Sequence, residues 1–271
     1  MIEIDERDIR EFDRHSSKGN QLKAKRDNTW YKADYTGYEG LVEYIVSRLL
    51  EKTSLNKSEY VLYDLEQIKY KRSIFNGCKS VDFLSEDWQI ITLQRLYKNR
   101  TGHNLNEVVW KFSDYSDRLK FFVTEVEKLT GITDFGKYMN KILTIDAFFL
   151  NEDRHMHNVA VLMNSNGEFK LCPIFDQGAS LLADTTLDYP MGEDIIQLMN
   201  EVEGKTICRR FDDALDVSEE LYGSNINFYF TKSDVTDLLN EAKIYSQEIR
   251  ERVKTIIFQQ MNKYQYLFKN K

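Results

Sequence analysis

The chain has 271 residues, of which 30% are charged and 13% are aromatic, and its formal net charge at pH 7 is −7. This length and aromatic content predict a folded protein with a continuous apolar core and exclude a disordered chain. An acidic balance has the wrong sign for a protein whose whole surface binds nucleic acid or anionic lipid. We therefore expect no direct nucleic-acid binding and no membrane binding.

The cysteines and the N-terminus indicate the compartment. Cys78, Cys172 and Cys208 are widely spaced and form no C-x-x-C pair, so neither a disulfide framework nor a thiolate zinc site is predicted. The first residues lack a basic-then-apolar leader, and no apolar run approaches the roughly 18 residues of a membrane span. We expect a soluble cytoplasmic protein, with secretion or translocation into a host as the alternative.

The first part of the chain, residues 1–68, predicts a small α+β unit. Residues 30–33 have strand character, and apolar residues at helical spacing follow between Leu41 and Leu50. The aromatic and β-branched run at 60–65 predicts a second strand.

Residues 69–271 predict a mainly helical second unit. Helical spacing spans 122–129, with Gly131 as the stop, and returns at 138–149. A single β-hairpin is expected at 159–162 and 169–174, around a turn at 164–167. One long amphipathic helix, with Ser233 as N-cap, is predicted to close the chain.

The strongest chemical pattern surrounds this hairpin. Asp153 and Asn158 form D-x-x-x-x-N directly before its first strand, and its second strand continues into Asp176. Phosphoryl transfer needs a carboxylate near the nucleophile's proton, and an amide and a second carboxylate to hold Mg²⁺ on nucleotide phosphates. The three side chains match these requirements, and the hairpin should bring Asn158 and Asp176 to neighbouring strand ends. The simpler alternative is an Asp and an Asn in a solvated turn.

Two features near the N-terminus strengthen the pattern. Lys32, in the first predicted strand, and Glu43, in the following helix, could form the ion pair that orients nucleotide phosphates, with Glu39 as the rival partner one turn earlier. Residues 16–23, which include Gly19, Gln21 and Lys23, lie where a loop over the phosphates would belong. This segment matches neither common glycine-rich phosphate motif, and its alternative interpretation is a basic surface turn.

Taken in order, these motifs resemble HipA-like serine/threonine kinases. The matching segments are S-x-x-G-x-Q-x-K at 16–23, the strand with Lys32, the helix from Glu43, NEDRHMHN at 151–158 and FDQG at 175–178. The resemblance covers the chain from about residue 14 and is closest to the compact, CtkA-like members, without the extra N-terminal subdomain of full-length HipA proteins. It implies an α+β, two-lobed protein-kinase-like fold, with residues 1–68 as the sheet-containing N-lobe and 69–271 as the helical C-lobe.

The same resemblance implies roles for individual residues. Lys32 would bind ATP phosphates together with the loop residues Gly19, Gln21 and Lys23, and Glu43 would orient Lys32. Asp153 would be catalytic, and Asn158 and Asp176 would hold Mg²⁺. Ser16 would be the serine that the family autophosphorylates, with Ser17 as a competing acceptor.

The resemblance further implies a bacterial toxin-type kinase with a protein substrate. Candidate substrates are a translation factor or an aminoacyl-tRNA synthetase, and an antitoxin is a candidate partner. Two alternatives stay open, namely a catalytically silent nucleotide-binding or partner-binding module and a lipid or small-molecule kinase.

Two further polar groups have structural interpretations. His155 and His157 could suggest zinc, but zinc sites usually have three or four ligands and few histidines remain elsewhere, so we expect His155 to support the loop backbone instead. Asp146 falls on the apolar face of its predicted helix. We expect it to accept hydrogen bonds from the loop that follows, because an unpaired buried carboxylate is costly.

Overall fold

The computed structural model describes residues 1–10 and 21–269. The chain divides into two compact units, each built from separate stretches of sequence. Unit 1 comprises Met1–Phe83, Phe175–Val202 and Asn227–Lys271, and unit 2 comprises Leu84–Ile174 and Glu203–Ile226.

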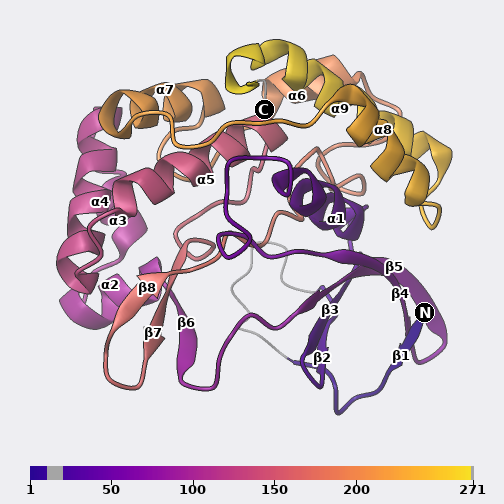
Figure 1. The fold of residues 1–271 in the computed structure, drawn as a ribbon, viewed down its shortest axis with the longest axis horizontal. Helices are drawn as coiled ribbons and strands as arrows, with labels where there is room; N and C mark the ends of the chain where they lie inside the picture. Colours follow the sequence, from indigo (N-terminus) through magenta and orange to yellow (C-terminus); the bar gives the residue numbers. More distant parts are fainter. Residues whose placement is uncertain (11–20, 270–271) are drawn as a thin grey trace. The chain divides into compact units, whose positions relative to one another are not determined.

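Unit 1 contains a five-stranded sheet in the order β1-β4-β5-β3-β2 (Figure 1). β1 pairs in parallel with β4, and the other neighbours are antiparallel. β3 confirms the strand predicted at 30–33, and its buried Tyr31 and Ala33 alternate with Lys32, which therefore faces the other side of the sheet. The strands are β1 (Ile2–Ile4), β2 (Lys23–Arg26), β3 (Thr29–Ala33), β4 (Asp64–Tyr70) and β5 (Ser73–Val81).

The strand predicted at 60–65 is wrong for most of its length, because β4 begins only at Asp64. The preceding residues are irregular, and Val61 and Tyr63 are buried beside Cys78 of β5. The backbone N–H of Tyr63 donates to the Ser47 hydroxyl at 3.1 Å, which satisfies a group that a strand partner would otherwise bind. The predicted lobe boundary at residue 68 falls within β4, which pairs along its length with β5.

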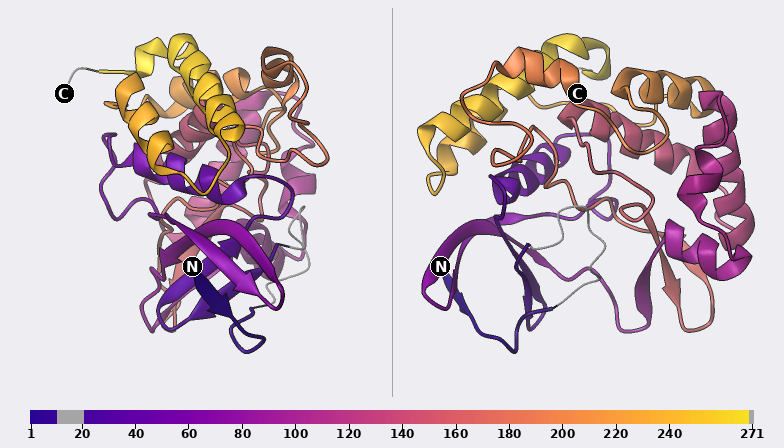
Figure 2. Two further views of the ribbon diagram at one scale, coloured as in Figure 1. Left: turned by 90° about the vertical axis from the view of Figure 1, so that its right-hand side faces the viewer. Right: turned by 180° about the vertical axis from the view of Figure 1, so that it is seen from behind.

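One helix of unit 1, α1, packs on this sheet, and the other long helices pack on α1 or on one another. α1 contacts β4 and β5 on one side and α8 on the other, an arrangement that Figures 1 and 2 both show. α1 confirms the helix predicted over 41–50. The helices are α1 (Glu39–Leu50), α6 (Ile195–Glu201), α8 (Lys232–Glu241), α9 (Gln247–Lys263) and the short 3₁₀ helix η1 (Gln265–Leu267).

The single long closing helix is a wrong prediction, because α8 and α9 are separate. Thr231, rather than Ser233, caps α8 by accepting from the N–H of Asp234, and Ser246 caps α9. The break buries Tyr245, whose hydroxyl donates to Asp34 at 2.8 Å. A continuous helical pattern in the sequence thus conceals a turn that a tertiary contact and a second N-cap stabilise.

Unit 2 contains a three-stranded antiparallel sheet, in the order β6-β7-β8, and five helices in the part of the chain that is described. The predicted hairpin is present as β7 and β8, but it is not alone, because β6 pairs with β7. The elements are β6 (Trp88–Thr92), α2 (Leu93–Thr101), α3 (Leu105–Val109), α4 (Tyr115–Thr130), α5 (Phe135–Phe149), β7 (Ala160–Asn164), β8 (Phe169–Leu171) and α7 (Phe211–Tyr222).

Two predicted helices form the core of this unit. α4 ends at Gly131, whose φ of 74° is the left-handed conformation expected of a helix stop. α5 is buried on nearly all sides and packs against α4 and α7. Its last turn leads directly into residues 151–158, so the buried helix fixes where the D-x-x-x-x-N loop begins.

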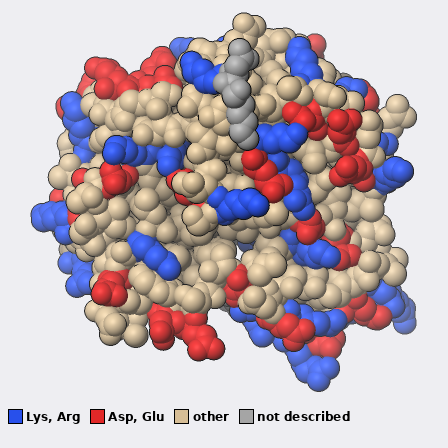
Figure 3. Space-filling view, viewed as in Figure 1, with Lys and Arg blue, Asp and Glu red and all other residues tan. Residues whose placement is uncertain are grey.

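The surface carries charges of both signs. On the face drawn in Figure 3, Lys and Arg side chains are interspersed with Asp and Glu. Within residues 1–10 and 21–269, no helix has the length and apolar character needed to cross a bilayer.

Candidate active site

Lys32 and Glu43 form the predicted ion pair in unit 1. Lys32 Nζ lies 2.6 Å from Glu43 Oε1, which joins the centre of β3 to α1. The helix reaches the sheet closely because two glycines meet: a Cβ on Gly40 would lie 2.5 Å from the Gly77 backbone of β5. Gly77 is paired with Ala33, the neighbour of Lys32 in β3. The contact therefore brings Gly40 close to the lysine's strand, and Glu43 follows Gly40 by about one turn of α1.

Glu39, the rival partner, has a different role. Its carboxylate accepts from the backbone N–H groups of Tyr35, Thr36 and Gly37 at 2.8 to 3.2 Å. It also accepts from the Thr36 hydroxyl at 2.8 Å. Glu39 therefore satisfies the turn that leads into α1 and leaves Glu43 as the lysine's partner.

Asp176 contacts the same lysine from the other side. Its Oδ1 lies 2.8 Å from Lys32 Nζ, and its φ of 62° places it in the left-handed region that Asp tolerates better than most residues. The next residue continues the contact, since the N–H of Gln177 donates to Glu43 Oε2 at 2.9 Å. The two oxygens of Glu43 thus join β3, α1 and the chain after Asp176.

The charges of this cluster are strongly coupled. Burial alone would lower the pKa of Lys32, but the carboxylates of Asp176 and Glu43 outweigh it and raise that pKa well above its ordinary value. Lys32 is therefore a fixed cation at neutral pH. The Lys32 ammonium also lies 5.3 Å from the centre of the Tyr63 ring. Burial, and then the charge of Glu43, raise the pKa of the Tyr63 hydroxyl, so the ring beside the lysine stays neutral.

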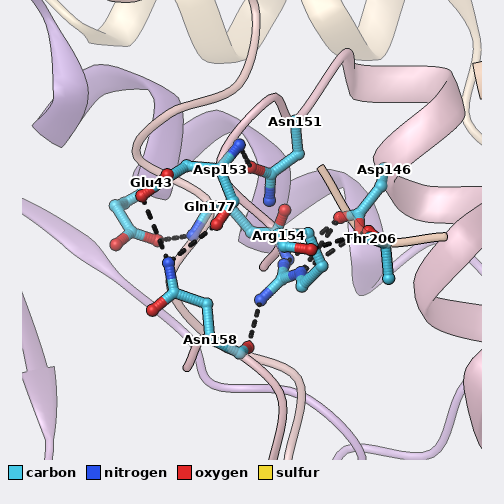
Figure 4. A network of polar contacts seen from close by, with 8 residues as sticks. All are labelled: Glu43, Asp146, Asn151, Asp153, Arg154, Asn158, Gln177 and Thr206. Atoms are coloured by element: carbon cyan, nitrogen blue, oxygen red, sulfur yellow. Dashed lines mark hydrogen bonds and ion pairs between the residues drawn. The ribbon is translucent and has the colours of Figure 1, made fainter. Parts of the chain in front are cut away.

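Asp153 and Asn158 meet in unit 2, in the loop between α5 and β7. The Asn158 amide nitrogen donates to the backbone oxygen of Asp153 at 2.8 Å and to its Oδ2 at 3.2 Å. Figure 4 shows that the amide oxygen of Asn158 points away from Asp153. The backbone N–H of Asp153 in turn donates to Asn151 Oδ1 at 3.2 Å. The loop therefore fixes a carboxylate and, beside it, an amide that presents its oxygen.

A buried ion pair supports this loop (Figure 4). Arg154 donates to both oxygens of Asp146 at 3.2 to 3.3 Å, and its Nη1 donates to the backbone oxygen of Asn158 at 3.0 Å. The Thr206 hydroxyl donates to the Arg154 carbonyl at 2.7 Å. Burial raises the pKa of Asp146, although Arg154 acts in the opposite direction. The expectation that Asp146 accepts hydrogen bonds from the following loop is confirmed.

His155 also supports the loop, as expected. Its Nδ1 accepts from the N–H of His157 at 3.2 Å, and its Nε2 lies 3.7 Å from Asp153 Oδ1. Over residues 1–10 and 21–269, no group of three or more His, Cys, Asp and Glu side chains is arranged to bind a metal ion.

The predicted phosphate loop is only partly described. Ser16, Ser17 and Gly19 lie outside the described residues. Gln21 precedes β2, and Lys23 begins that strand, where its Cα is paired with that of Lys32 in the antiparallel register. The assignment of this loop to nucleotide phosphates stays a prediction.

The structure thus brings the predicted residues together in two groups. Lys32, Glu43 and Asp176 form one cluster within unit 1, and Asp153 and Asn158 form the other within unit 2. The hairpin pairs Val161 with Leu171, so the chain enters β7 and leaves β8 at the same end of the hairpin.

Sequence reasoning missed two contributors. The first is Arg154, which makes the main hydrogen bonds within the loop. The only sequence signal for this role is that a charged residue lies between the motif positions Asp153 and Asn158. Phe83, the last residue of the first stretch of unit 1, packs against Phe175 with ring centres 6.1 Å apart. Both rings cover the cluster of Val61, Tyr63 and Cys78. No sequence pattern indicated this contact, which joins residues far apart in the chain.

Comparison with solved structures identifies the fold. The chain is similar to the crystal structure of a Helicobacter pylori proinflammatory kinase, CtkA, with a TM-score of 0.61 and 17% sequence identity over 90% of each chain. The likeness confirms the predicted α+β, kinase-like fold. No protein-family profile matches the chain, and no curated protein matches it in sequence.

Proposed function

We propose that the protein is an ATP- and Mg²⁺-dependent serine/threonine protein kinase of the HipA-like type. One observation carries the proposal: Lys32, a largely enclosed lysine of the sheet with its side chain 15% exposed, is held by two carboxylates, Glu43 at 2.6 Å and Asp176 at 2.8 Å. In protein kinases a strand lysine is oriented by a helix glutamate while a nearby aspartate holds Mg²⁺ on the nucleotide phosphates, and Lys32, Glu43 and Asp176 have these residue types in this arrangement.

In this proposal each residue of unit 1 has a separate task. Lys32 binds ATP phosphates, and Glu43 keeps the ammonium in place through the rigid α1 helix. Asp176 presents its carboxylate to Mg²⁺, and a bound Mg²⁺ neutralises charge on the nucleotide phosphates. Gly19, Gln21 and Lys23 are proposed to cover the phosphates.

The loop in unit 2 supplies the remaining groups. Asp153 accepts or orients the proton of the substrate hydroxyl, and Asn158 provides an amide oxygen as the second Mg²⁺ ligand. The donor set fits that ion, since Mg²⁺ is commonly held by one or two protein oxygens together with substrate phosphates. The hydrogen bonds from the Asn158 nitrogen to Asp153 support this assignment because they leave the oxygen as the outward atom.

The acceptor is proposed to be a serine or threonine of a protein. By resemblance, a translation factor or an aminoacyl-tRNA synthetase is the proposed substrate class, and the kinase is proposed to act as a toxin with an antitoxin partner. Autophosphorylation is proposed at Ser16. The similar H. pylori protein is described as a proinflammatory kinase, which supports the reaction class.

Phosphate transfer to a bacterial lysate tests the proposal. The wild type, given γ-labelled ATP with Mg²⁺, should label one or a few proteins, and Asp153→Ala should label none. The matched control is Asp216→Ala, which removes an exposed carboxylate on α7 and should behave as wild type. Labelled lipid or metabolite with unlabelled protein would contradict protein kinase activity. Absence of any transfer by the wild type, with ATP still bound, would identify a silent nucleotide-binding module instead.

A further inference from the structure

The segment that follows Asp176 adopts an unfavourable backbone conformation. Of the six non-glycine residues with positive φ in the described part of the chain, three are Asp176, Leu181 and Leu182, at 62°, 54° and 56°. The left-handed region is unfavourable for leucine because its Cβ comes too close to a carbonyl oxygen. Such residues persist only where their surroundings hold them, and they concentrate at functional sites. Both leucines are fully buried.

The side chain of Tyr38 holds the two leucines. This residue directly precedes α1, and its hydroxyl donates to the Leu181 carbonyl at 2.7 Å and lies 3.0 Å from the Leu182 carbonyl. Burial raises the pKa of Tyr38 to about 12, although Arg252 acts in the opposite direction. The hydroxyl therefore keeps its proton at neutral pH and can donate it to a carbonyl.

Arg252 of α9 completes the contact. Its Nε donates to the Tyr38 oxygen at 3.2 Å, its Nη2 to the Tyr189 carbonyl at 3.0 Å and its Nη1 to the Pro190 carbonyl at 3.3 Å. Arg252 is only 3% exposed, and the three oxygens that accept from it belong to one hydroxyl and two carbonyls. A buried guanidinium bonded to neutral oxygens contributes little net stability, and its planar fork fixes geometry instead.

The turn before α1 contacts the same segment. The Thr36 carbonyl accepts from the N–H and the hydroxyl of Thr186, at 3.0 and 2.6 Å. A Cβ on Gly37 would lie 1.8 Å from the Ala183 oxygen, so only glycine permits this approach. Residues 181–190 are thus held from the start of α1 and from α9, both within unit 1.

We infer that Tyr38 and Arg252 are positioning residues that hold residues 177–186 in the conformation in which the Asp176 carboxylate meets Lys32. The near end of the segment is fixed by Glu43 through the N–H of Gln177. Farther along, Tyr38 holds the carbonyls of Leu181 and Leu182, and Arg252 in turn holds the Tyr38 oxygen and the carbonyls of the residues just after the segment. Because Tyr38 precedes the helix that carries Glu43, one element positions both carboxylates that contact the lysine. The inference rests on the proposed function, in which Asp176 binds Mg²⁺ with ATP.

Hydrogen exchange tests the holding role without any nucleotide. Tyr38→Phe removes only the hydroxyl. Tyr44→Phe is the matched control, because the hydroxyl of Tyr44, which lies in α1 itself, bonds instead to Glu241 at 3.2 Å. In Tyr38→Phe, amides of residues 177–186 should exchange about five- to tenfold faster, which is the change expected from the loss of one hydrogen bond. Amides of β4 and β5 serve as the internal reference and should not change in either variant.

Nucleotide binding tests the consequence. In Tyr38→Phe, the affinity for ATP with Mg²⁺ should fall about five- to tenfold, while the affinity for metal-free ATP stays within about twofold. If Tyr38→Phe does not fold, Arg252→Lys can replace it, because lysine keeps the charge but lacks the planar fork of the guanidinium. Arg252→Lys should then show the faster exchange and the weaker Mg²⁺-dependent ATP binding, each to a smaller extent.

Unchanged exchange in 177–186, or an equal loss of affinity with and without Mg²⁺, would overturn the inference. A wild type that binds no ATP would instead refute the proposed function. In that case the exchange measurement alone still decides whether Tyr38 holds the segment.

Discussion

Lys32 and Asp176 are 144 positions apart in the sequence, yet their charged atoms lie 2.8 Å apart. The contact joins the middle of the sheet of unit 1 to the chain that has just left unit 2. Glu43 holds both sides of it, through the lysine and through the N–H of Gln177. Removing any one of these groups should therefore change both nucleotide binding and folding stability, in proportions that differ between variants.

Lys32→Met should abolish detectable phosphate transfer and also lower the free energy of unfolding. Two carboxylates that share the ammonium would lose it, and breaking a buried pair typically costs about 3 to 5 kcal/mol. Partial exposure of Asp176 should bring the loss toward the lower end. Urea denaturation measures it, with Lys69→Met in β4 as the control, because the Lys69 side chain and its ion-pair partner Glu3, 3.0 Å away, are both largely open to solvent at 38% and 68% exposure. A variant as stable as wild type would show that the pair is not coupled to folding.

Asp176→Asn should weaken ATP binding in the presence of Mg²⁺ by at least about tenfold and leave metal-free binding nearly unchanged, because only the ion loses a carboxylate charge. Titration calorimetry with and without Mg²⁺ checks this. Wild-type binding that is identical under the two conditions would mean that Asp176 is a structural carboxylate.

Asp34 should make stability depend on pH. Burial, and to a smaller extent Glu39, raise its pKa from 3.8 to about 7, although hydrogen bonds from the Gly40 N–H and the Tyr245 hydroxyl act in the opposite direction. Between about pH 4 and 7 the folded state therefore binds a proton that the unfolded chain has lost, and the free energy of unfolding falls as pH rises through this window.

Asp34→Asn removes this titration. The free energy of unfolding of the variant minus that of wild type should increase by on the order of 2 kcal/mol from pH 5 to pH 8. This is about half the full value of such a pKa shift, because the carboxyl is only partly buried. Urea unfolding at the two pH values measures the difference, with Asp216→Asn as the control. A difference that is the same at both values would show that Asp34 ionises normally.

Arg154→Met should lower the free energy of unfolding by about 3 kcal/mol or more, because it leaves the buried Asp146 carboxylate unpaired. The double variant Asp146→Leu with Arg154→Met should recover much of the stability, since an apolar pair needs no partner. Phosphate transfer should stay low in both variants, because the bond to the Asn158 carbonyl is lost. Recovery of transfer together with stability would show that Arg154 only stabilises the fold.

Local signals in the sequence predicted what depends on local chemistry. Gly131 ends α4, and the turn residues at 164–167 join β7 to β8, because backbone conformation there is set by the residues themselves. The break between α8 and α9 depends instead on Tyr245 reaching Asp34, a partner 211 positions away. No periodicity could reveal that contact.

The candidate site likewise contains features that local sequence predicts and features that depend on contacts between distant segments. Lys32 and Glu43 could be paired from their spacing on a strand and the next helix, and the choice over Glu39 is confirmed. The left-handed leucines and the contact of Tyr38 with Arg252 could not be predicted, because they depend on segments that are distant in the sequence.

We propose that Lys32, held by Glu43, and Asp176 bind the nucleotide with its Mg²⁺, whereas Asp153 acts on the acceptor. A titration of Asp153→Ala and Lys32→Met with ATP and Mg²⁺, alongside transfer assays on the same samples, tests it most directly. Asp153→Ala should bind ATP within about twofold of wild type and transfer no phosphate, while Lys32→Met should bind ATP at least about tenfold more weakly. Wild-type transfer by Asp153→Ala, or loss of ATP binding equal to that of Lys32→Met, would contradict it.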